Sequence, residues 1–482
     1  LSLAASSVSF PSAAAAVCER VLPAALELVR SPLMQSHALH ALTSFFAALV
    51  AANLPAVKAD DLLERLMDGR SGAGGAGAGS EMKAEGEAAA VAGRTAAVCV
   101  AAVCAGVNDA KHTSATAAAL VKQLGDPASL SEKDLLALFC LGELGKAGDL
   151  SAVAGVEAAL LGALDAPGEE LKSAASVALG GVATGGRGKF LPMILSHVAN
   201  ESHKHQYSLF LSLREVIRNG GVDDPEDASR TLEILFANAG SEEEGVRNVV
   251  AECLGLLAVG DASSLAPRLA EKVSSGDART RATSVLAMKY SALALADDDA
   301  AAVAVFAEVL PAFVGSIPLR DEDRDVRRAA VQTLSAAAHA RPALARPILA
   351  DALPAVFEQT VIDKSSVRVV DLGPFKHTVD DGLELRKAAF ECCDTLLDAC
   401  LPADSLANGG ESVSGCASGY VAALVTGLGD HYDVKMVSHA LLAKLATRPG
   451  ASAVLLQRLK ELVDPMVKTL TAKLKGDAVK QE

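Results

Sequence analysis

Three histidines and one glutamate, His197, Glu201, His203 and His205, gather in a short segment and could together bind a metal ion. The segment reads HVANESHKH, a spacing that matches no standard zinc pattern. His37 and His40 lie at i and i+3 of an expected helix, but no carboxylate or cysteine stands at a matching spacing. We interpret these side chains as parts of a solvated turn and an ordinary helix, and we expect no bound metal.

Three cysteines, Cys392, Cys393 and Cys400, could form a redox cluster. However, Cys392 holds the same place as Cys253 in another copy of the repeat described below, which predicts a buried structural thiol. The nine cysteines of the chain include no Cys-x-x-Cys motif. We interpret them as reduced thiols and expect a protein of the cytoplasm and nucleus.

The stretch from Gly72 to Gly77 formally matches the G-x-G-x-x-G motif of dinucleotide-binding proteins. No strand is expected before it and no βαβ context surrounds it, so a linker is the simpler interpretation. The sequence contains no G-x-x-x-x-G-K-[ST], H-E-x-x-H or G-x-S-x-G motif. We therefore expect a protein that is not an enzyme and that needs no cofactor.

The composition indicates what kind of scaffold carries these side chains. Alanine makes up close to a fifth of the 482 residues, aromatic residues only 3%, and tryptophan is absent. Alanine favours helices over strands, so we expect helices that pack closely through small side chains. The net charge of −15 disfavours binding to nucleic acid. No stretch is continuously apolar over the roughly 18 residues that span a bilayer, so no membrane partner is expected.

One helix signature repeats along the chain. A short acidic or glycine-containing turn precedes a basic residue and a helix of small residues, once per roughly 35 to 50 residues, close to the period of HEAT or armadillo repeats. The repeated basic residues are Lys172, Arg247, Arg281, Arg327, Arg386 and Lys435. We interpret them as a ladder that pairs with turn aspartates of neighbouring repeats; a basic binding stripe is the alternative.

Stacked helix pairs bury faces that no single pair could bury alone. The predicted fold class is all-α: a HEAT-repeat α-solenoid, wound as a right-handed superhelix, with one projecting β-hairpin. The expected organisation is HEAT-type repeats over 1–69, a Gly/Ala-rich flexible linker over 70–86, repeats over 87–360, a β-hairpin insertion over 361–382, a HEAT helix over 383–402, a flexible loop over 403–419 and repeats over 420–482.

The segment from Val361 to Gly382 departs from the helical pattern. It is rich in β-branched residues, and Gly373-Pro374 separates two short extended runs, Val367–Asp371 and Phe375–Asp380, a pattern typical of a β-hairpin. Loops that project from a rigid scaffold often carry recognition. We therefore expect the hairpin to contact a partner; a structural plug between repeats is the alternative.

Five segments carry a family resemblance. They are SPLMQSHALHALTSFFAALV (31–50), EELKSAASVALG (169–180), GVRNVVAECLG (245–255), GPFKHTVDDGLELRKAAFECCDTLLDAC (373–400) and AVLLQRLKELVDPM (453–466). In this order, over nearly the whole chain, they resemble the cullin-associated, neddylation-dissociated proteins, the HEAT-repeat exchange factors of cullin-RING ubiquitin ligases. The chain looks like the C-terminal part of such a protein, and its opening, which lacks an initiator Met, looks like an interior cut.

The resemblance implies a non-enzymatic role in SCF and other cullin-RING ligases. Family members wrap around an un-neddylated cullin, and their C-terminal repeats grip its N-terminal, adaptor-binding region. A hairpin in these repeats blocks the adaptor's place, so that one adaptor–F-box module is exchanged for another. The family's contacts with the cullin C-terminal region and the RING subunit belong to repeats that this sequence lacks. The 70–86 and 403–419 segments depart from the family pattern and should carry no shared function.

By the same resemblance, the partner-binding residues would be those of the hairpin. They are Val367, Arg368, Val369, Val370, Asp371, Leu372, Gly373, Pro374, Phe375, Lys376, His377 and Thr378. Within this set, Val369, Leu372 and Phe375 could insert into an apolar groove of the partner. Arg368 and Lys376 could meet acidic side chains at its rim.

Two other classes of function compete with this hypothesis. A generic HEAT scaffold, such as a nuclear transport receptor or a phosphatase scaffold, also uses a concave helical surface. Nothing in such a scaffold requires the PFKHTVDDGL segment. An enzyme of unknown chemistry is disfavoured because the sequence offers no nucleophile–base or metal constellation.

Overall fold

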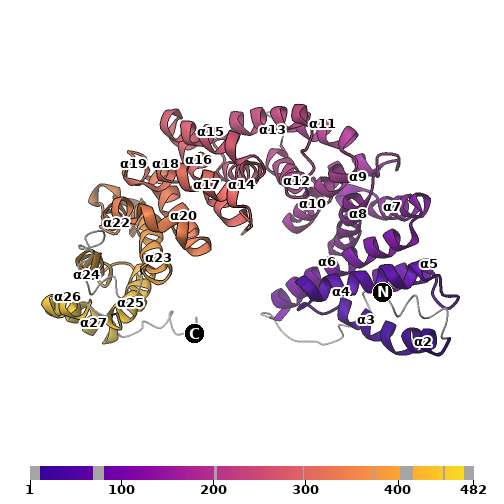
Figure 1. Cartoon of the computed structure of the whole chain (residues 1–482), viewed down its shortest axis with the longest axis horizontal. Helices are drawn as coiled ribbons and strands as arrows, with labels where there is room; N and C mark the ends of the chain where they lie inside the picture. Colours follow the sequence, from indigo (N-terminus) through magenta and orange to yellow (C-terminus); the bar gives the residue numbers. More distant parts are fainter. Residues whose placement is uncertain are drawn as a thin grey trace. The chain divides into compact units, whose positions relative to one another are not determined.

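A computed structural model of the chain describes residues 11–68, 81–199, 204–296, 298–372, 375–401, 416–448 and 451–471 (Figure 1). The chain divides into two compact units, Leu1–Ile234 and Leu235–Glu482. Each unit is a stack of α-helices, and the second also holds a two-stranded antiparallel sheet.

In the first unit, five long helices pack one on the next. These stacking helices are α4 (Ser36–Ala51), α6 (Glu81–Val107), α8 (Leu135–Ala147), α10 (Glu169–Gly185) and α12 (Gln206–Arg218). A second helix packs on four of them: α5 (Ala59–Met67) on α6, α7 (Ala110–Leu124) on α8, α9 (Val156–Ala163) on α10 and α11 (Arg187–Val198) on α12. The shorter elements are α2 (Pro11–Ala16), the π-helix η1 (Val17–Val21), α3 (Leu22–Val29) and the 3-10 turns η2 (Pro127–Ser129) and η3 (Glu132–Asp134). Helix α13 (Pro225–Asn238) runs across the boundary between the units.

The second unit repeats this plan. Its stacking helices are α14 (Glu244–Gly260), α16 (Ala278–Ala294), α20 (Arg324–Ala340), α23 (Leu383–Ala399) and α25 (Tyr432–Ala446). The other helices of this unit are α15 (Ala262–Ser275), α17 (Ala300–Val309), α18 (Pro311–Val314), α19 (Ser316–Leu319), α21 (Pro342–Ala345), α22 (Leu349–Glu358), α24 (Cys416–Gly427), α26 (Ala451–Gln457) and α27 (Leu459–Leu470). Most of them pack on a stacking helix, whereas α17 packs on α15 and α18, and α27 packs on α24. The 3-10 turns η4 (Arg346–Ile348) and η5 (Lys364–Ser366) and the strands β1 (Val367–Leu372) and β2 (Phe375–Asp380) complete it.

The repeat signature of the sequence marks the stacking helices. The repeated basic residues from Lys172 to Lys435 lie on α10, α14, α16, α20, α23 and α25. Asp277 and Asp323 precede two of these helices and accept hydrogen bonds from backbone N–H groups of the first turn, which is the cap that their positions predict. The predicted HEAT-type α-solenoid with a β-hairpin is confirmed, whereas the right-handed twist stays a prediction.

Small residues let the stacking helices approach closely. A Cβ atom at Gly181 of α10 would lie 2.4 Å from the carbonyl oxygen of Gly142 in α8. A Cβ atom at Gly255 of α14 would lie 2.4 Å from the carbonyl oxygen of Ala287 in α16. The Ser291 hydroxyl of α16 donates to the Gly255 carbonyl oxygen over 3.0 Å. The abundance of small residues thus serves contact between helix backbones.

Two predicted boundaries need correction. Helix α6 begins at Glu81, so residues 81–86 of the predicted linker are helical, while residues 70–80 lie outside the described part of the chain. Glutamate, methionine, lysine and alanine favour a helix enough to carry it through Gly86. Helix α24 begins at Cys416, so the predicted 403–419 loop is too long, and its residues 403–415 also lie outside the described part.

Gly419 explains why the second boundary was misplaced. The sequence pattern predicts that this glycine belongs to a polar loop, but it lies inside α24. A Cβ atom there would lie 2.3 Å from Cε2 of Phe357, far closer than real side chains approach. The glycine therefore serves packing between α24 and α22, and its local sequence contains no sign of that neighbour.

One segment of α6 is long and apolar enough to cross a membrane by length and composition. It is Ala90–Val107, in which Arg94 is the only charged residue. The bent pair Ala300–Val309 and Pro311–Leu319 passes the same test as a unit. Helix α6 packs against α4 and α8, and core helices of water-soluble proteins have this composition too. The absence of a membrane partner stays a prediction.

Candidate functional site

The predicted hairpin is present in the second unit. Strands β1 and β2 pair antiparallel from Val367 opposite Asp380 to Leu372 opposite Phe375. The two predicted extended runs are confirmed, and the first strand is one residue longer than expected. Gly373 and Pro374, the predicted turn, lie outside the described residues. Just before β1, the Asp363 side chain accepts a hydrogen bond from the Ser365 backbone N–H over 2.9 Å.

The hairpin exposes side chains that have no packing role in the helical stack. Val369 is 62% exposed, and Arg368 and Thr378 are also exposed, while Val367 and Val370 are half-buried. The side chains of residues 371–377 lie outside the described part of the structure. An exposed valine does not fit a structural plug between repeats. Contact with a partner stays a prediction for all twelve candidate residues.

The strand register separates residues that the sequence hypothesis grouped together. Successive residues of a strand belong to opposite faces. Val369 therefore shares a face of the ribbon with its pairing partner Thr378, whereas positions 372 and 375 belong to the other face. A partner groove that contacts only one face of the ribbon could hold Val369 or the pair at 372 and 375, but not all three. Contact of Val369, Leu372 and Phe375 with a partner stays a prediction.

Arg368, which we expected to meet an acidic rim on a partner, has a carboxylate partner within the chain. Its Nε donates to Oδ2 of Asp381 over 2.9 Å. This hydrogen bond lowers the pKa of Asp381 and raises the pKa of Arg368. The guanidinium is exposed, so water and salt weaken the pair, and a partner carboxylate could replace Asp381.

A buried arginine holds the base of the hairpin. Arg386 of α23 is 2% exposed, and its Nη1 and Nη2 donate to Oδ1 and Oδ2 of Asp380 over 3.2 and 2.7 Å. Its Nε and Nη2 also donate to Oδ2 and Oδ1 of Asp430 over 2.8 and 3.0 Å. Burial by itself would lower the pKa of Arg386, but the two carboxylates raise it. The guanidinium in turn keeps the pKa of Asp380 below its ordinary value.

The equivalent arginines of two earlier repeats, Arg281 and Arg327, also form hydrogen bonds with neighbouring turns. Arg281 donates to both carboxylate oxygens of Asp321 over 2.9 and 2.7 Å and to the Gly276 carbonyl oxygen of its own turn over 3.0 Å. Arg327 donates to the Asp321 carbonyl oxygen over 2.7 Å and to Oε1 of Gln359 over 3.1 Å. The predicted pairing with a neighbouring repeat's turn aspartate is confirmed for Arg281 and Arg386.

For Arg247 and Lys172 the ladder prediction is wrong, and for Lys435 it stays a prediction. Arg247 donates to the carbonyl oxygens of Ser241 and Glu242 in its own turn over 2.8 and 3.0 Å. The next turn aspartate, Asp277, already caps α16, whereas the following turn has Asp323 as the cap and Asp321 free to pair. Lys172 pairs with Glu169 one turn earlier in its own helix, over 2.7 Å.

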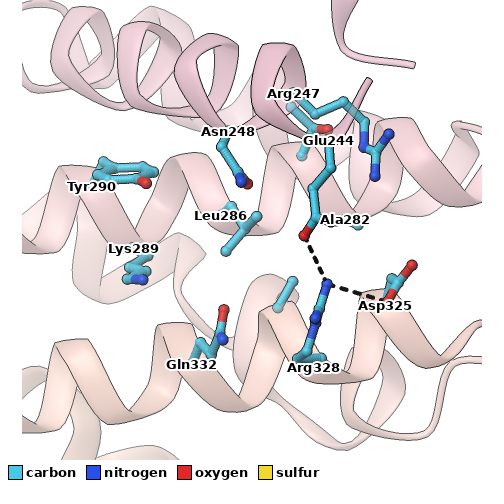
Figure 2. A pocket seen from close by; sticks show the side chains of 12 residues that line it. Glu244, Arg247, Asn248, Ala282, Leu286, Lys289, Tyr290, Asp325, Arg328 and Gln332 are labelled. Atoms are coloured by element: carbon cyan, nitrogen blue, oxygen red, sulfur yellow. Dashed lines mark hydrogen bonds and ion pairs between the residues drawn. The ribbon is translucent and has the colours of Figure 1, made fainter. Parts of the chain in front are cut away.

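A polar groove of about 250 Å³ runs across α14, α16 and α20 (Figure 2). Nη2 of Arg328 lies 3.1 Å from Oε1 of Glu244 and 3.3 Å from Oδ1 of Asp325. The Lys289 ammonium lies 5.6 Å from the centre of the Tyr290 ring. The other side chains that line the groove are Arg247, Asn248, Ala282, Thr283, Leu286, Ala329 and Gln332. These groups can form hydrogen bonds and ion pairs with a protein surface.

The metal and redox candidates of the sequence have ordinary surroundings. Nδ1 of His197 lies 2.9 Å from the Met193 carbonyl oxygen, and residues 200–203 lie outside the described part of the chain. Among the described residues, no group of three or more histidine, cysteine, aspartate or glutamate side chains could hold a metal ion. His37 and His40 are exposed on α4.

The cysteine prediction is confirmed. Cys392, Cys253 and Cys393 are all fully buried. Burial raises the pKa of Cys393 well above its ordinary value and raises the pKa of Cys416 to about 12. All nine cysteines of the chain are free thiols. Eight of them are buried and act as small apolar side chains in the core, whereas Cys18 is half-buried.

Known proteins resemble this chain over nearly its whole length. Residues 344–482, which include the hairpin and Arg386, match the family model TIP120, described as TATA-binding protein interacting (TIP20). The chain is 43% identical over 476 residues to the cullin-associated NEDD8-dissociated protein 1 of Arabidopsis thaliana, which covers 97% of this chain and 36% of that protein. It is 33% identical over 318 residues to the cullin-associated NEDD8-dissociated protein 1, C-terminal part, of Emericella nidulans, which covers 65% of this chain and 28% of that protein.

A solved structure of importin beta is similar at 14% identity with a TM-score of 0.42, covering 94% of this chain and 57% of that chain. The assignment of family does not depend on that similarity. The chain spans little more than a third of the length of the cullin-associated NEDD8-dissociated proteins of Arabidopsis thaliana and Mus musculus. It is a homologue of the C-terminal part of the cullin-associated NEDD8-dissociated proteins.

Proposed function

We propose that this chain is a non-enzymatic scaffold that binds un-neddylated cullin and displaces adaptor–substrate-receptor modules from it. The relatives are named for association with cullin and dissociation from NEDD8, and we extend that association to this chain. The observation that carries the proposal is the exposed β1–β2 hairpin inside the 344–482 family match. It is the one two-stranded element of the described residues, and it exposes Val369.

The two parts of the second unit would divide the work. The stacking helices offer a polar surface, including the groove around Arg328 (Figure 2), over which affinity for cullin could be distributed. The hairpin would occupy the place that the adaptor otherwise takes on the N-terminal region of cullin. Because both ligands bind cullin with overlapping surfaces, each lowers the affinity of the other by the same factor. Exchange of modules then needs neither a catalytic residue nor a cofactor.

A binding experiment with the chain itself tests this proposal. Immobilised un-neddylated cullin, with and without a bound adaptor–F-box module, is incubated with the chain. We expect the chain to be captured and the adaptor to be released as the chain concentration rises. Neddylated cullin serves as the matched control and should capture much less of the chain. No capture by un-neddylated cullin would favour the generic HEAT scaffold instead.

The role of the hairpin is tested by deletion of residues 367–378. The shortened chain should still bind free cullin but should no longer release the adaptor. Phe375→Ala should weaken adaptor release without changing the melting temperature. Unchanged competition by the deletion variant would show that the hairpin is not the competing element.

The compartment and the remaining partners follow from the same proposal. The free thiols are suited to the reducing cytoplasm and nucleus, where we propose that the chain acts. Contact with the RING subunit is proposed to need repeats outside this chain. Binding to un-neddylated cullin in the absence of the RING subunit would support that division.

A further inference from the structure

We propose that Arg386 is a positioning residue: through Asp380 it sets the pose of the hairpin relative to the repeat that begins at Asp430. This pose, and not the hairpin sequence alone, determines how well the hairpin displaces an adaptor. The effect on displacement rests on the proposed function, whereas the effect on the pose does not.

The first step of the argument is the position of Asp380. It is the last residue of β2, and its carboxylate faces the guanidinium of Arg386 with two hydrogen bonds of 3.2 and 2.7 Å. Oδ1 of Asp380 also accepts from the Gly382 backbone N–H over 3.0 Å, so one carboxylate holds both the strand end and the turn that leads into α23. The base of the hairpin is thereby joined to the core.

The second step is the unequal burial of the two carboxylates. The side chain of Asp430 is 5% exposed and that of Asp380 is 25% exposed, around a guanidinium that is 3% exposed. A buried guanidinium needs a carboxylate partner. Asp430 can supply it when Asp380 is lost. Removal of Asp380 should therefore free the hairpin while the bond between the repeats remains.

The third step is the length of the hairpin, because a small rotation at its base moves its far end by a larger distance. Five residue steps separate Asp380 from Phe375, about 16 Å at roughly 3.3 Å per residue. A rotation of about 15° at the base would move the closed end of the ribbon by about 4 Å over this length. The paired residues Val369 and Thr378 lie between the base and the closed end of the ribbon. A fixed base is thus a condition for a defined contact.

A neighbouring aspartate provides a matched control. Asp381 also binds an arginine at the hairpin base, Arg368, but that pair is exposed and involves no residue of the core. We compare Asp380→Asn with Asp381→Asn, each isosteric and each removing one charge. In Asp380→Asn, amide hydrogen exchange in β1 and β2 should accelerate about tenfold, the effect expected from one charge-assisted hydrogen bond. In Asp381→Asn it should change less than about twofold.

The same variants are then tested in adaptor displacement from un-neddylated cullin. Asp380→Asn should slow displacement by about tenfold at unchanged affinity for free cullin, and Asp380→Glu should restore part of the rate because it keeps the carboxylate. Hydrogen exchange at the wild-type rate in the hairpin of Asp380→Asn would overturn the proposal. So would equal acceleration throughout α23 and α25, because Asp380 would then be a general structural residue.

The outcomes separate this proposal from the function on which it rests. If the hairpin loosens but displacement by Asp380→Asn stays unchanged while deletion of 367–378 abolishes it, the pose does not matter and the proposal fails. If the deletion also leaves displacement unchanged, the proposed function of the hairpin fails. The hydrogen-exchange result would still decide whether Arg386 positions the hairpin.

Discussion

Arg281 and Arg386 occupy equivalent places on two stacking helices, yet they hold different elements. Each forms two hydrogen bonds with an aspartate of the following repeat, Asp321 or Asp430. Towards its own turn, Arg281 donates to a backbone carbonyl oxygen, whereas Arg386 donates to the carboxylate at the end of β2. The comparison shows how the same repeated arginine can hold an inserted element. The backbone carbonyl oxygen that Arg281 binds in its own turn is replaced, at Arg386, by the carboxylate of Asp380 in the hairpin.

The difference in burial between the two sites predicts the largest effect. Arg386→Met leaves Asp430 buried beside an apolar side chain, and we expect a loss of about 3–5 kcal/mol in the free energy of unfolding. Arg281→Met should cost about 1–3 kcal/mol, because the Arg281 and Asp321 side chains are 22% and 15% exposed and retain some water. Urea unfolding of the two variants measures both. Equal losses would show that the deeper burial of Arg386 and Asp430 does not make their pair more important for stability.

The contact between stacking helices should tolerate less change than the hairpin. Gly255→Ala places a methyl group 2.4 Å from the Ala287 carbonyl oxygen, and overpacking of this kind costs about 1–3 kcal/mol. Gly260→Ala, at the end of the same helix, is the control because its Cβ would meet nothing within 4 Å. A lower melting temperature in the first variant and an unchanged or raised one in the second is the expected result.

Acidification should weaken both ladder sites through their aspartates. Arg386 lowers the pKa of Asp380, and Arg281 lowers the pKa of Asp321 against the opposing effect of burial. A carboxylate whose pKa is lower in the folded state stabilises the fold above its unfolded pKa of about 3.9, and this stability is lost as the pH falls through the folded value. The free energy of unfolding should therefore decrease below about pH 4.

Variants assign this pH dependence to the two sites. Asp380→Asn and Asp321→Asn should each flatten the decrease, since one titrating group is gone. Urea unfolding between pH 6 and pH 3 measures it. An unchanged slope in both variants would mean that other carboxylates dominate the acid response.

The smallest change in stability is expected at the exposed face of the hairpin. Val369→Thr preserves a β-branched side chain at a position that is 62% exposed, so the free energy of unfolding should change by less than about 0.5 kcal/mol. Adaptor displacement is the sensitive measurement here, and it should weaken if Val369 contacts the partner. A clear loss of stability would favour the structural plug.

Local patterns explain how far the sequence could be interpreted. The repeated basic residues predicted where the stacking helices lie. Gly373-Pro374 between β-branched runs predicted the hairpin strands to within one residue. Both predictions succeed because helix and hairpin patterns depend on residues close in sequence. The prediction that Gly419 is a loop residue is wrong. A glycine is needed at this position because the ring of Phe357, 62 positions away in the sequence, leaves no room for a side chain. The twelve candidate residues of the hairpin stay predictions about a partner.

The sequence by itself determined the helical repeat, the place of the hairpin and the family, since periodicity, turn chemistry and similarity are all contained in the order of residues. Tertiary structure decided which acceptor each arginine found. Arg247, Arg281 and Arg386 occupy the same place in the repeat, but their bonds depend on which neighbouring carboxylates are already used as helix caps. The distance from Arg386 to Asp430 spans 44 positions along the chain, and only the stacking of α23 and α25 brings the two side chains together.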